Sequence, residues 1–511
     1  MLAKAFSGAV YGVDAYAVEI EVNAGRGDPQ TVIVGLPDAA VKESKDRVET
    51  ALINSGYKPP RGRTTINLAP ADVKKEGPSF DLPIALGMLA ATDDIPGEPL
   101  LNYCVVGELA LSGEVRRVRG ILPIALNARQ EGRKGMIVPV DNAEEAAVVE
   151  GLEVYPVRTL REAGDFMAGK IPVAPFQLDV HEVFNSYSAY DDDFADVKGQ
   201  ESAKRALEVA MAGGHNILLL GPPGTGKSML SRRVPSILPP MSMDESLETT
   251  KIHSISGSLP AHQALVARRP FRAPHHTISD AGLLGGGSHP MPGEVSLSHH
   301  GVLFLDELPE FHRNVLEVMR QPLEDGFVTI SRAAASVTFP SRFMLVAAMN
   351  PCPCGFFGDL RRECRCSPLQ IQRYRNKISG PLLDRIDIHV EVPAVNYQQL
   401  ASMEKGEPSE KIRERVIKAR QIQQHRFKGV AKVHCNANMR AKDVHKYCRP
   451  DPDAENSLKM ALSDLNFSAR AYDRILKVSR TIADLEGSEQ VLLPHVSEAI
   501  QYRSLDRQYW V

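Results

Sequence analysis

The chain has 511 residues, of which 43% are hydrophobic and 24% are charged, and its formal net charge at pH 7 is −3. These values are typical of a soluble globular protein of about two to four domains, and they exclude a protein that binds nucleic acid through bulk positive charge. No run approaches the ~18 consecutive apolar residues of a transmembrane helix, and the first residues lack the apolar core of a signal peptide. We therefore expect a cytoplasmic protein without a membrane partner, whose seven cysteines are reduced.

The first 165 residues predict a compact α/β domain, because short β-type runs such as AVEIEVN and QTVIVGL alternate with helical stretches such as DAAVKESKDRVETALINSG. Residues 166–193 are irregular and end in an acidic run, which predicts a linker. Strands and helices alternate again in residues 194–395, and residues 396–511 are mostly helical. The sequence thus predicts a multidomain α/β protein with a helical C-terminal domain.

The stretch NILLLGPPGTGKSMLSRRV carries the strongest motif of the chain. A buried-strand run, residues 216–220, leads into residues 221–228, which fit G-x-x-x-x-G-K-[ST] and open a helix. In this context backbone N–H groups and the helix N-terminus hold phosphates, while Lys227 reaches the outer phosphates and the Ser228 hydroxyl ligates magnesium. The predicted nucleotide-binding residues are Gly221, Pro222, Pro223, Gly224, Thr225, Gly226, Lys227, Ser228 and Met229.

Two later strands end in polar residues that complete such a site. In GVLFLDELPEF, four apolar residues run into Asp306 and Glu307. We expect Asp306 to orient the magnesium ion and Glu307 to polarise the attacking water. The strand FMLVAAMN ends at Asn350, whose side chain can reach between the γ-phosphate and that water.

Four cysteines follow Asn350 in NPCPCGFFGDLRRECRCSP, spaced as C-x-C, nine residues, C-x-C. A disulfide is disfavoured in the cytoplasm, whereas neighbouring arginines favour a low-pKa redox pair. Four thiolates can also make a closed, structural zinc site, although C-x-C spacing is less usual than C-x₂₋₄-C. The sequence permits three interpretations: a zinc site, a redox pair or thiols that bind no metal. The residues concerned are Cys352, Cys354, Cys364 and Cys366.

Two arginines in the last third of the chain are further candidates for catalysis. Arg385 lies at the start of a strand in SGPLLDRIDIHVEV, far from the phosphate loop, so it is more useful in a neighbouring subunit's site. A structural ion pair with Asp384 or Asp387 is the alternative. Arg470 begins a C-terminal helix that could fold back onto the nucleotide.

A basic segment lies between these two arginines. Residues 411–450 contain twelve Lys or Arg and two acids, a local patch that could bind a phosphate backbone. A solvated helix face explains the same count equally well.

Together these motifs resemble those of AAA+ ATPases, in particular the magnesium-chelatase-related branch. FRAPHHTISDAGLLGGGSHPMPGEVSLSHHGVLFLDELPEF, NPCPCGFFGD and ISGPLLDRIDIHVEVP are similar to the ComM/YifB family of bacterial chelatase-like ATPases, over nearly the whole chain. The resemblance implies a Walker A lysine, a Walker B pair, a sensor 1, an arginine finger and a sensor 2, which correspond to Lys227, Asp306 with Glu307, Asn350, Arg385 and Arg470. It also implies a central AAA+ P-loop α/β/α domain, a C-terminal helical lid, and a homo-hexameric ring with ATP sites between subunits.

Two insertions resemble those of the branch that contains the MCM helicases. Residues 255–300 stand where the helix-2 insertion belongs, and residues 326–340 contain two β runs around a turn, matching the hairpin before sensor 1. In related helicases these elements grip DNA in the ring channel, which makes Arg332 the candidate for a DNA backbone contact. An ordinary surface arginine remains the alternative, since phosphate contacts have no sequence signature.

The N-terminal domain is similar to the proteolytic domain of Lon and its S5-like relatives, through KKEGPSFDLPIALGMLAA and VVGELALSGEVRRVRGILPIALNARQEG. Ser79 stands where the Lon nucleophile does, and such a serine needs a lysine to take its proton. The matching position is Leu122 or Pro123, and neither can act as a base. We therefore expect a non-proteolytic Lon/S5-like domain.

The resemblance implies an ATPase, with ATP and Mg²⁺ as cofactors, that acts on single-stranded or branched DNA. The expected activity is that of a helicase or branch-migration factor in natural transformation and recombination. The alternative is a magnesium-chelatase-type motor that remodels a protein partner. The ATPase core alone does not separate the two, but a dedicated chelatase motor subunit does not carry the Lon-like domain.

Overall fold

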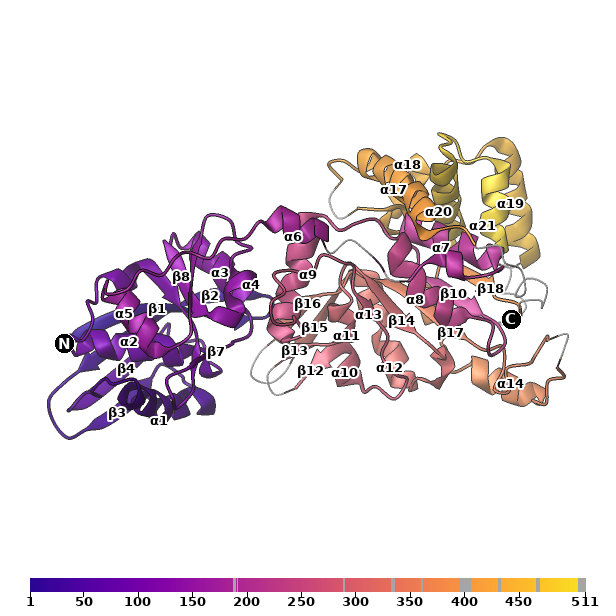
Figure 1. Ribbon diagram of the computed structural model, residues 1–511. Helices are drawn as coiled ribbons and strands as arrows, with labels where there is room; N and C mark the ends of the chain where they lie inside the picture. Colours follow the sequence, from indigo (N-terminus) through magenta and orange to yellow (C-terminus); the bar gives the residue numbers. More distant parts are fainter. Residues whose placement is uncertain are drawn as a thin grey trace. The chain divides into compact units, whose positions relative to one another are not determined.

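The computed structural model describes residues 1–186, 190, 192–287, 290–331, 336–359, 362–394, 406–430, 433–465 and 469–503. The chain forms two compact units (Figure 1). The first unit consists of residues 1–187, 243–267 and 333–339, and the second of residues 188–242, 268–332 and 340–511. None of the helices in these described ranges is long and apolar enough to cross a membrane.

The first unit is built on a seven-stranded mixed sheet with the order β3-β4-β2-β1-β5-β8-β9. Its strands are β1 (Leu2–Tyr11), β2 (Asp14–Ala24), β3 (Gln30–Val34), β4 (Arg63–Ala69), β5 (Tyr103–Val105), β8 (Gly135–Pro139) and β9 (Glu153–Val157), with a separate pair β6 (Glu108–Leu109) and β7 (Val115–Arg116). The helices are α1 (Ala39–Asn54), α2 (Asp81–Ala91), α3 (Ile121–Gln130), α4 (Ala143–Ala146), α5 (Leu160–Met167), α6 (Val180–Ser186) and α9 (Met243–Ser256). Every residue of α2 is buried, because its sequence DLPIALGMLAA is apolar on all sides.

Three segments outside residues 1–165 belong to this unit, namely residues 166–187, 243–267 and 333–339. Helix α9 comes from the middle of the chain, and the backbone N–H of Gly120 donates to the carbonyl of Ser254, 3.3 Å away. The region between α5 and the second unit contains α6, and Val180 is buried in a cluster that also contains Leu265.

The second unit is built on a five-stranded parallel sheet with the order β11-β14-β17-β10-β18. Its strands are β10 (Ile217–Leu220), β11 (Phe271–Arg272), β14 (Val302–Leu305), β17 (Met344–Met349) and β18 (Ile388–Glu391), and shorter strands are β12 (Gly285–Gly286), β13 (Met291–Pro292) and β15 (Phe327–Ser331). Strand β16 (Ser336–Pro340) falls in the first unit except for its last residue. The helices around the sheet are α7 (Glu201–Gly213), α8 (Lys227–Ile237), α10 (Asp280–Leu284), α11 (Glu294–Leu297), α12 (Arg313–Val318), α13 (Arg320–Asp325), α14 (Pro368–Arg375) and α15 (Gly380–Leu383). Strands β15 and β16 fall within the predicted hairpin, and Arg332 lies outside the described residues.

The last part of the chain is helical, as its sequence predicts, and its helices gather next to α7 (Figure 1, orange to yellow). They are α17 (Ser409–Arg426), α18 (Ala441–Tyr447), α19 (Pro452–Leu465), α20 (Ala469–Glu486) and α21 (Leu493–Gln501). One hydrophobic core joins them to the parallel sheet, and it includes Val416 of α17, Ile482 of α20 and Ile217 of β10. The predicted fold class, a mixed α/β protein with a helical C-terminal region, is therefore confirmed.

Candidate functional site

The predicted phosphate loop joins β10 to α8, at the carboxyl end of the central strands. Gly226 has φ +90°, which favours glycine, and a Cβ at Gly221 would lie 2.2 Å from the carbonyl oxygen of Val392. The close approach of two backbones thus requires glycine at position 221. Because the first N–H groups of a helix have no partner within the helix, the start of α8 presents donors and a positive dipole end to an anion.

Lys227 is the first residue of α8, directly after the loop, and is only 7% exposed. Its Nζ donates to the carbonyls of Gly221 at 2.6 Å and Pro222 at 2.9 Å, and to Oδ1 of Asn350 at 3.1 Å. Burial lowers the pKa of Lys227 to about 8, and the carboxylates of Asp306 and Glu307 oppose that shift. The structure thus brings the predicted phosphate-binding lysine and the polar residue at the end of β17 into direct contact.

Ser228 and Asp306 also meet, although they are 78 positions apart in the chain. The Ser228 hydroxyl donates to Oδ2 of Asp306 at 2.5 Å. A hydroxyl and a carboxylate beside a phosphate-binding loop are oxygen ligands of the kind that Mg²⁺ takes together with nucleotide phosphates. These two residues therefore fit a magnesium ion.

Glu307 follows Asp306 but is exposed, with φ +53°. That left-handed conformation is uncommon for a residue other than glycine, and such strain gathers at functional sites. Oε2 of Glu307 lies 3.7 Å from Nδ1 of His276. No sequence pattern points to His276, because only the fold brings it next to the carboxylate.

Arg385 has a different environment from the one expected. It pairs with Glu324 and donates through Nη1 to the carbonyl of Pro381 at 2.7 Å. Asp384 instead lies 3.7 Å from Nη1 of Arg470, an exposed side chain at the start of α20. The two arginines therefore lie at neighbouring positions in the second unit.

Both arginines lie at the end of the sheet opposite the phosphate loop. Strand β18 runs parallel to β10, and Arg385 precedes β18 whereas Gly221 follows β10. The side chain of Asn216, just before β10, donates to the Arg385 carbonyl at 2.8 Å. Four strand residues at ~3.3 Å each separate the two ends, which is too far for Arg385 to reach the phosphates held by its own chain.

An open cleft of about 590 Å³ lies against the phosphate loop. Gln200 helps to form it, since its Nε2 donates to the carbonyls of Thr225 at 3.2 Å and Pro393 at 2.7 Å. Several residues of this cleft could not be predicted from the sequence, because they come from four separate parts of the chain. The lining residues are Asp196, Lys198, Gln200, Pro222, Pro223, Gly224, Thr225, Gly226, Met229, Phe356, Asp359, Arg362 and Ala394.

The four cysteines after Asn350 come together in space. Cys352 is buried, the other three are partly buried, and all four are free thiols. Their sulfur atoms all lie within 4.8 Å of one another. This arrangement fits a metal ion better than four independent thiols.

In the first unit Ser79 is half-buried, whereas Leu122 and Pro123 are buried. The carbonyl of Ser79 accepts from the N–H of Gly107, and Leu122 is fully buried. Lys75, close to Ser79 in the chain, is also buried, and its Nζ donates to the carbonyl of Val73 at 2.7 Å.

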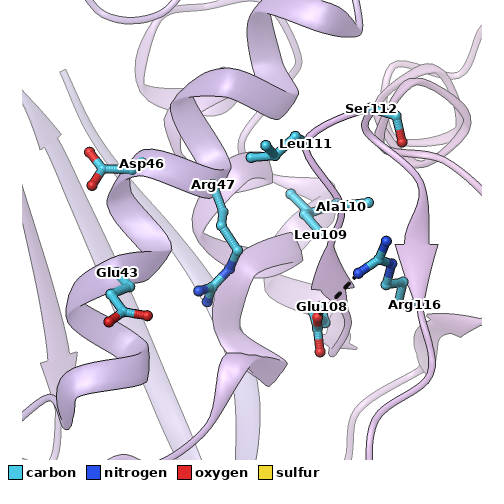
Figure 2. Close-up of a pocket in the computed structure, with 9 residues that line it drawn as sticks. All are labelled: Glu43, Asp46, Arg47, Glu108, Leu109, Ala110, Leu111, Ser112 and Arg116. Carbon is cyan, nitrogen blue, oxygen red and sulfur yellow. Dashed lines mark ion pairs between the residues drawn. The ribbon is translucent and has the colours of Figure 1, made fainter.

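A second cleft, of about 680 Å³, opens in this unit between α1 and the pair β6–β7 (Figure 2). Figure 2 shows Arg116 pointing towards Glu108, 3.9 Å away, with Arg47 also facing the cleft. Charges of both signs line the cleft, and Ser79 is not among its lining residues. The geometry therefore does not connect this cleft to the serine.

Three family models match consecutive parts of the chain. Residues 20–142 match "Subunit ChlI of Mg-chelatase", residues 193–400 match "Magnesium chelatase, subunit ChlI", and residues 406–503 match "Magnesium chelatase, subunit ChlI C-terminal". These matches cover both the sheet with the phosphate loop and the C-terminal helices.

Similar proteins extend over nearly the full length. The chain is 46% identical over 510 residues to the competence protein ComM of Haemophilus influenzae, covering 99% of this chain and 98% of that protein. It is 43% identical over 508 residues to the YifB protein of Salmonella typhimurium, covering 99% and 98%. Lon protease 2 of Bacillus subtilis is 26% identical over 194 residues, which cover 34% of this chain and 35% of that protease.

These similarities fit the geometry described above: a phosphate loop, a carboxylate pair and a polar strand end on a parallel sheet, followed by helices. They support a magnesium-chelatase-type AAA+ ATPase, part of which is similar to a Lon protease. The chain belongs to the ComM/YifB family of magnesium-chelatase-like AAA+ proteins.

Proposed function

We propose that this protein is an ATP-hydrolysing motor that acts on DNA, as a helicase or branch-migration factor in natural transformation and recombination. The observation that carries the ATPase part is the contact of Lys227 with Asn350 and of Ser228 with Asp306 around one phosphate loop. The DNA part rests on the competence protein to which the chain is similar over nearly its whole length.

The residues of the site divide the work of phosphoryl transfer. Lys227 and the N–H groups at the start of α8 hold the phosphates, and Ser228 with Asp306 would hold the magnesium ion. When bound, magnesium neutralises charge that develops on the phosphate oxygens. Glu307 is the group that polarises the attacking water, and the side chain of Asn350 holds that water near the γ-phosphate.

Arg385 and Arg470 are proposed to act on a neighbouring subunit's nucleotide. Both lie at the end of the sheet opposite their own phosphate loop, which supports a ring in which each ATP site combines two chains. We propose a homo-hexamer as the ring, as the family resemblance implies. The arginine supplied in trans stabilises charge in the transition state, a role worth ~10³–10⁵ in rate.

The basic segment contributes fewer free charges than its sequence indicates. Several of its arginines are engaged within the unit: Arg415 with Glu407 and Glu208, Arg420 with the Met211 carbonyl, Arg426 with Asp484, and Arg440 with Asp443. The other exposed cations of this segment, as far as it is described, are Lys411, Lys418, Lys428, Lys442, Lys446 and Arg449. These residues are the proposed DNA contacts that the structure describes, and Arg332 is the proposed contact outside the described residues.

The DNA activity is tested by fluorescence anisotropy with labelled single-stranded and branched DNA, with and without an ATP analogue. We expect binding that weakens steeply between 50 and 200 mM salt, as expected for counterion release, and ATP hydrolysis that DNA accelerates. A folded protein that hydrolyses ATP but shows neither response at low salt would contradict the DNA part and leave the ATPase part standing.

A second candidate is a magnesium-chelatase-type motor that remodels a protein partner, since all three matching family models describe that enzyme's ChlI subunit. The protein partner would accelerate ATP hydrolysis by such a motor, whereas DNA would neither bind to it nor change that rate. We further propose that the Lon-like unit is non-proteolytic, which the buried, apolar side chain of Leu122 supports. A structural Zn²⁺ on the four cysteines is proposed as an additional cofactor.

A further inference from the structure

We infer that the four cysteines hold a zinc ion that builds one wall of the nucleotide cleft, so that Phe356 and Arg362 contact the bound nucleotide only when the metal is in place. This inference rests on the proposed ATPase function. It makes the zinc site part of the ATP-binding apparatus instead of a remote stabilising element.

The sulfur atoms have the spacing that zinc requires. Sγ of Cys352 lies 3.4 Å from that of Cys354 and 3.7 Å from that of Cys364, and the last two are 3.6 Å apart. Zn–S bonds of about 2.3 Å in a tetrahedron place neighbouring sulfurs about 3.8 Å apart. The cluster therefore matches a closed four-thiolate site with no open position for catalysis.

Backbone donors surround the sulfur atoms. The N–H of Cys354 donates to Sγ of Cys366 at 3.4 Å, and the N–H of Cys366 donates to Sγ of Cys364 at 3.5 Å. Such hydrogen bonds orient metal ligands and stabilise negative charge on thiolates. The loop is thus organised around the sulfurs.

Arg375 anchors the beginning of the same loop. This buried side chain, from α14, donates through Nε and Nη2 to the carbonyl of Pro351, at 3.2 Å in both cases. Its guanidinium also lies 5.0 Å from the ring centre of Phe357. The loop is therefore held at Pro351 by protein contacts and further along by the cysteines.

The residue that follows the second cysteine touches the phosphate loop. Gly355 has φ +85°, and a Cβ there would lie 2.5 Å from Cδ of Pro223. Since Gly355 is bonded to Cys354, a movement of the cysteine cluster is transmitted directly to Pro223. The metal site and the phosphate loop are therefore in direct packing contact through Gly355 and Pro223.

Three residues between the two cysteine pairs line the cleft. They are Phe356, Asp359 and Arg362, and Lys198 and Gln200 line the same cleft. The Arg362 guanidinium lies 5.1 Å from the ring centre of Phe356, and its backbone N–H donates to Oδ1 of Asp359 at 3.1 Å. An aromatic face and a guanidinium offer stacking and charge to a nucleotide. A loop without its metal would lose the geometry that presents them.

The metal is tested by elemental analysis of the full chain, purified without chelator. We expect about one zinc per chain, full retention in Cys104→Ala as a control outside the cluster, and loss in Cys364→Ser. Absence of metal, or iron in place of zinc, would overturn the inference. Because Cys364→Ser can misfold, zinc is also removed from the wild-type protein with a mercurial reagent and chelator, and retention of secondary structure is checked by circular dichroism.

The coupling is tested by the affinity for the fluorescent analogue mant-ATP. We expect about tenfold weaker binding after zinc removal, recovery when Zn²⁺ is added back, and a similar loss in Phe356→Leu and Arg362→Ala with zinc content unchanged. Arg365→Ala, an exposed arginine of the same loop outside the cleft, should bind as the wild type does. Wild-type affinity that is insensitive to zinc removal overturns the inference alone. A zinc-loaded wild type that binds no mant-ATP overturns the proposed ATPase function and the coupling with it.

Discussion

Asp306 and Glu307 are neighbours in the chain, yet their side chains have different environments. Asp306 is partly buried and accepts from Ser228, whereas Glu307 is exposed beside His276. A carboxylate held by a hydroxyl suits a metal ligand, and a carboxylate in a solvent-accessible position suits a group that polarises water. Glu307 also has a positive φ, a strained conformation of the kind that gathers at functional sites.

Replacing Glu307 should separate nucleotide binding from hydrolysis. Glu307→Gln keeps the shape of the side chain but cannot take a proton, so we expect wild-type mant-ATP affinity and phosphate release slower by about 10²-fold or more. The matched control is Glu310→Gln, an exposed carboxylate paired with Lys377 at 3.3 Å, which should hydrolyse ATP normally. Equal rates for the two variants would contradict the role of Glu307.

At the scale of elements, the sequence predicts best what is local. Residues 216–228 specify strand, loop and helix in one stretch, and the structure has β10, the phosphate loop and α8 there. The partner of Arg385 could not be predicted in this way, because Glu324 lies 61 positions earlier and meets it only in the fold. The cleft residues Lys198 and Arg362 were missed for the same reason.

Helix α20 is attached to the sheet by a buried ion pair that the sequence does not reveal. Arg474 pairs with Asp387, and the carboxylate also lies 3.0 Å from Nδ1 of His215. Burial alone would raise the pKa of Asp387, but Arg474 and His215 hold it below its usual range. The stabilisation is therefore complete above about pH 4 and is lost as the pH falls further.

Removal of this pair should loosen the C-terminal helices. Arg474→Leu leaves a buried carboxylate without its cation, and we expect a loss of about 3 kcal/mol at pH 7, seen as a lower Tm in differential scanning fluorimetry. Lys459→Ala breaks an exposed pair with Glu455 and should change stability by less than about 0.5 kcal/mol. An unchanged Tm for Arg474→Leu would show that the pair does not fasten α20.

Removal of the Ser79 hydroxyl should not change the activities of the protein. The lysine position of the Lon pattern is expected at Leu122 or Pro123, both of which are buried and neither of which is a base that could activate Ser79. Ser79→Ala is expected to keep wild-type ATP hydrolysis and DNA binding, measured side by side with Lys227→Ala as an inactive control. A large loss of either activity, with the fold preserved in circular dichroism, would assign Ser79 a function.

At the scale of the whole molecule, the chain order and the spatial units differ. Residues 243–267 are enclosed in the sequence by the ATPase motifs, yet they pack with the first unit, where the N–H of Gly120 bonds to Ser254. No local pattern predicts this, because the apolar residues of an inserted helix do not specify which core they join. The family resemblance predicts the set of domains, whereas the composition of each unit requires the fold.

A mixing experiment tests whether each ATP site combines residues of two neighbouring chains. Lys227→Ala removes the phosphate-binding lysine and keeps Arg385, while Arg385→Ala does the reverse, so each variant alone should be nearly inactive. In randomly mixed rings about a quarter of the interfaces combine an intact loop with an intact arginine, and ATP hydrolysis should reappear to about that fraction.

The control for this experiment mixes Lys227→Ala with the double variant Lys227→Ala/Arg385→Ala, which has no intact loop and should remain inactive. Subunit exchange is verified by energy transfer between labelled chains, and the thermal stability of Arg385→Ala is measured because the substitution also removes the pair with Glu324. Rings that exchange subunits but recover no hydrolysis would place Arg385 outside the neighbour's site. Recovery would instead explain why its position, at the opposite end of the sheet from the phosphate loop, is compatible with catalysis.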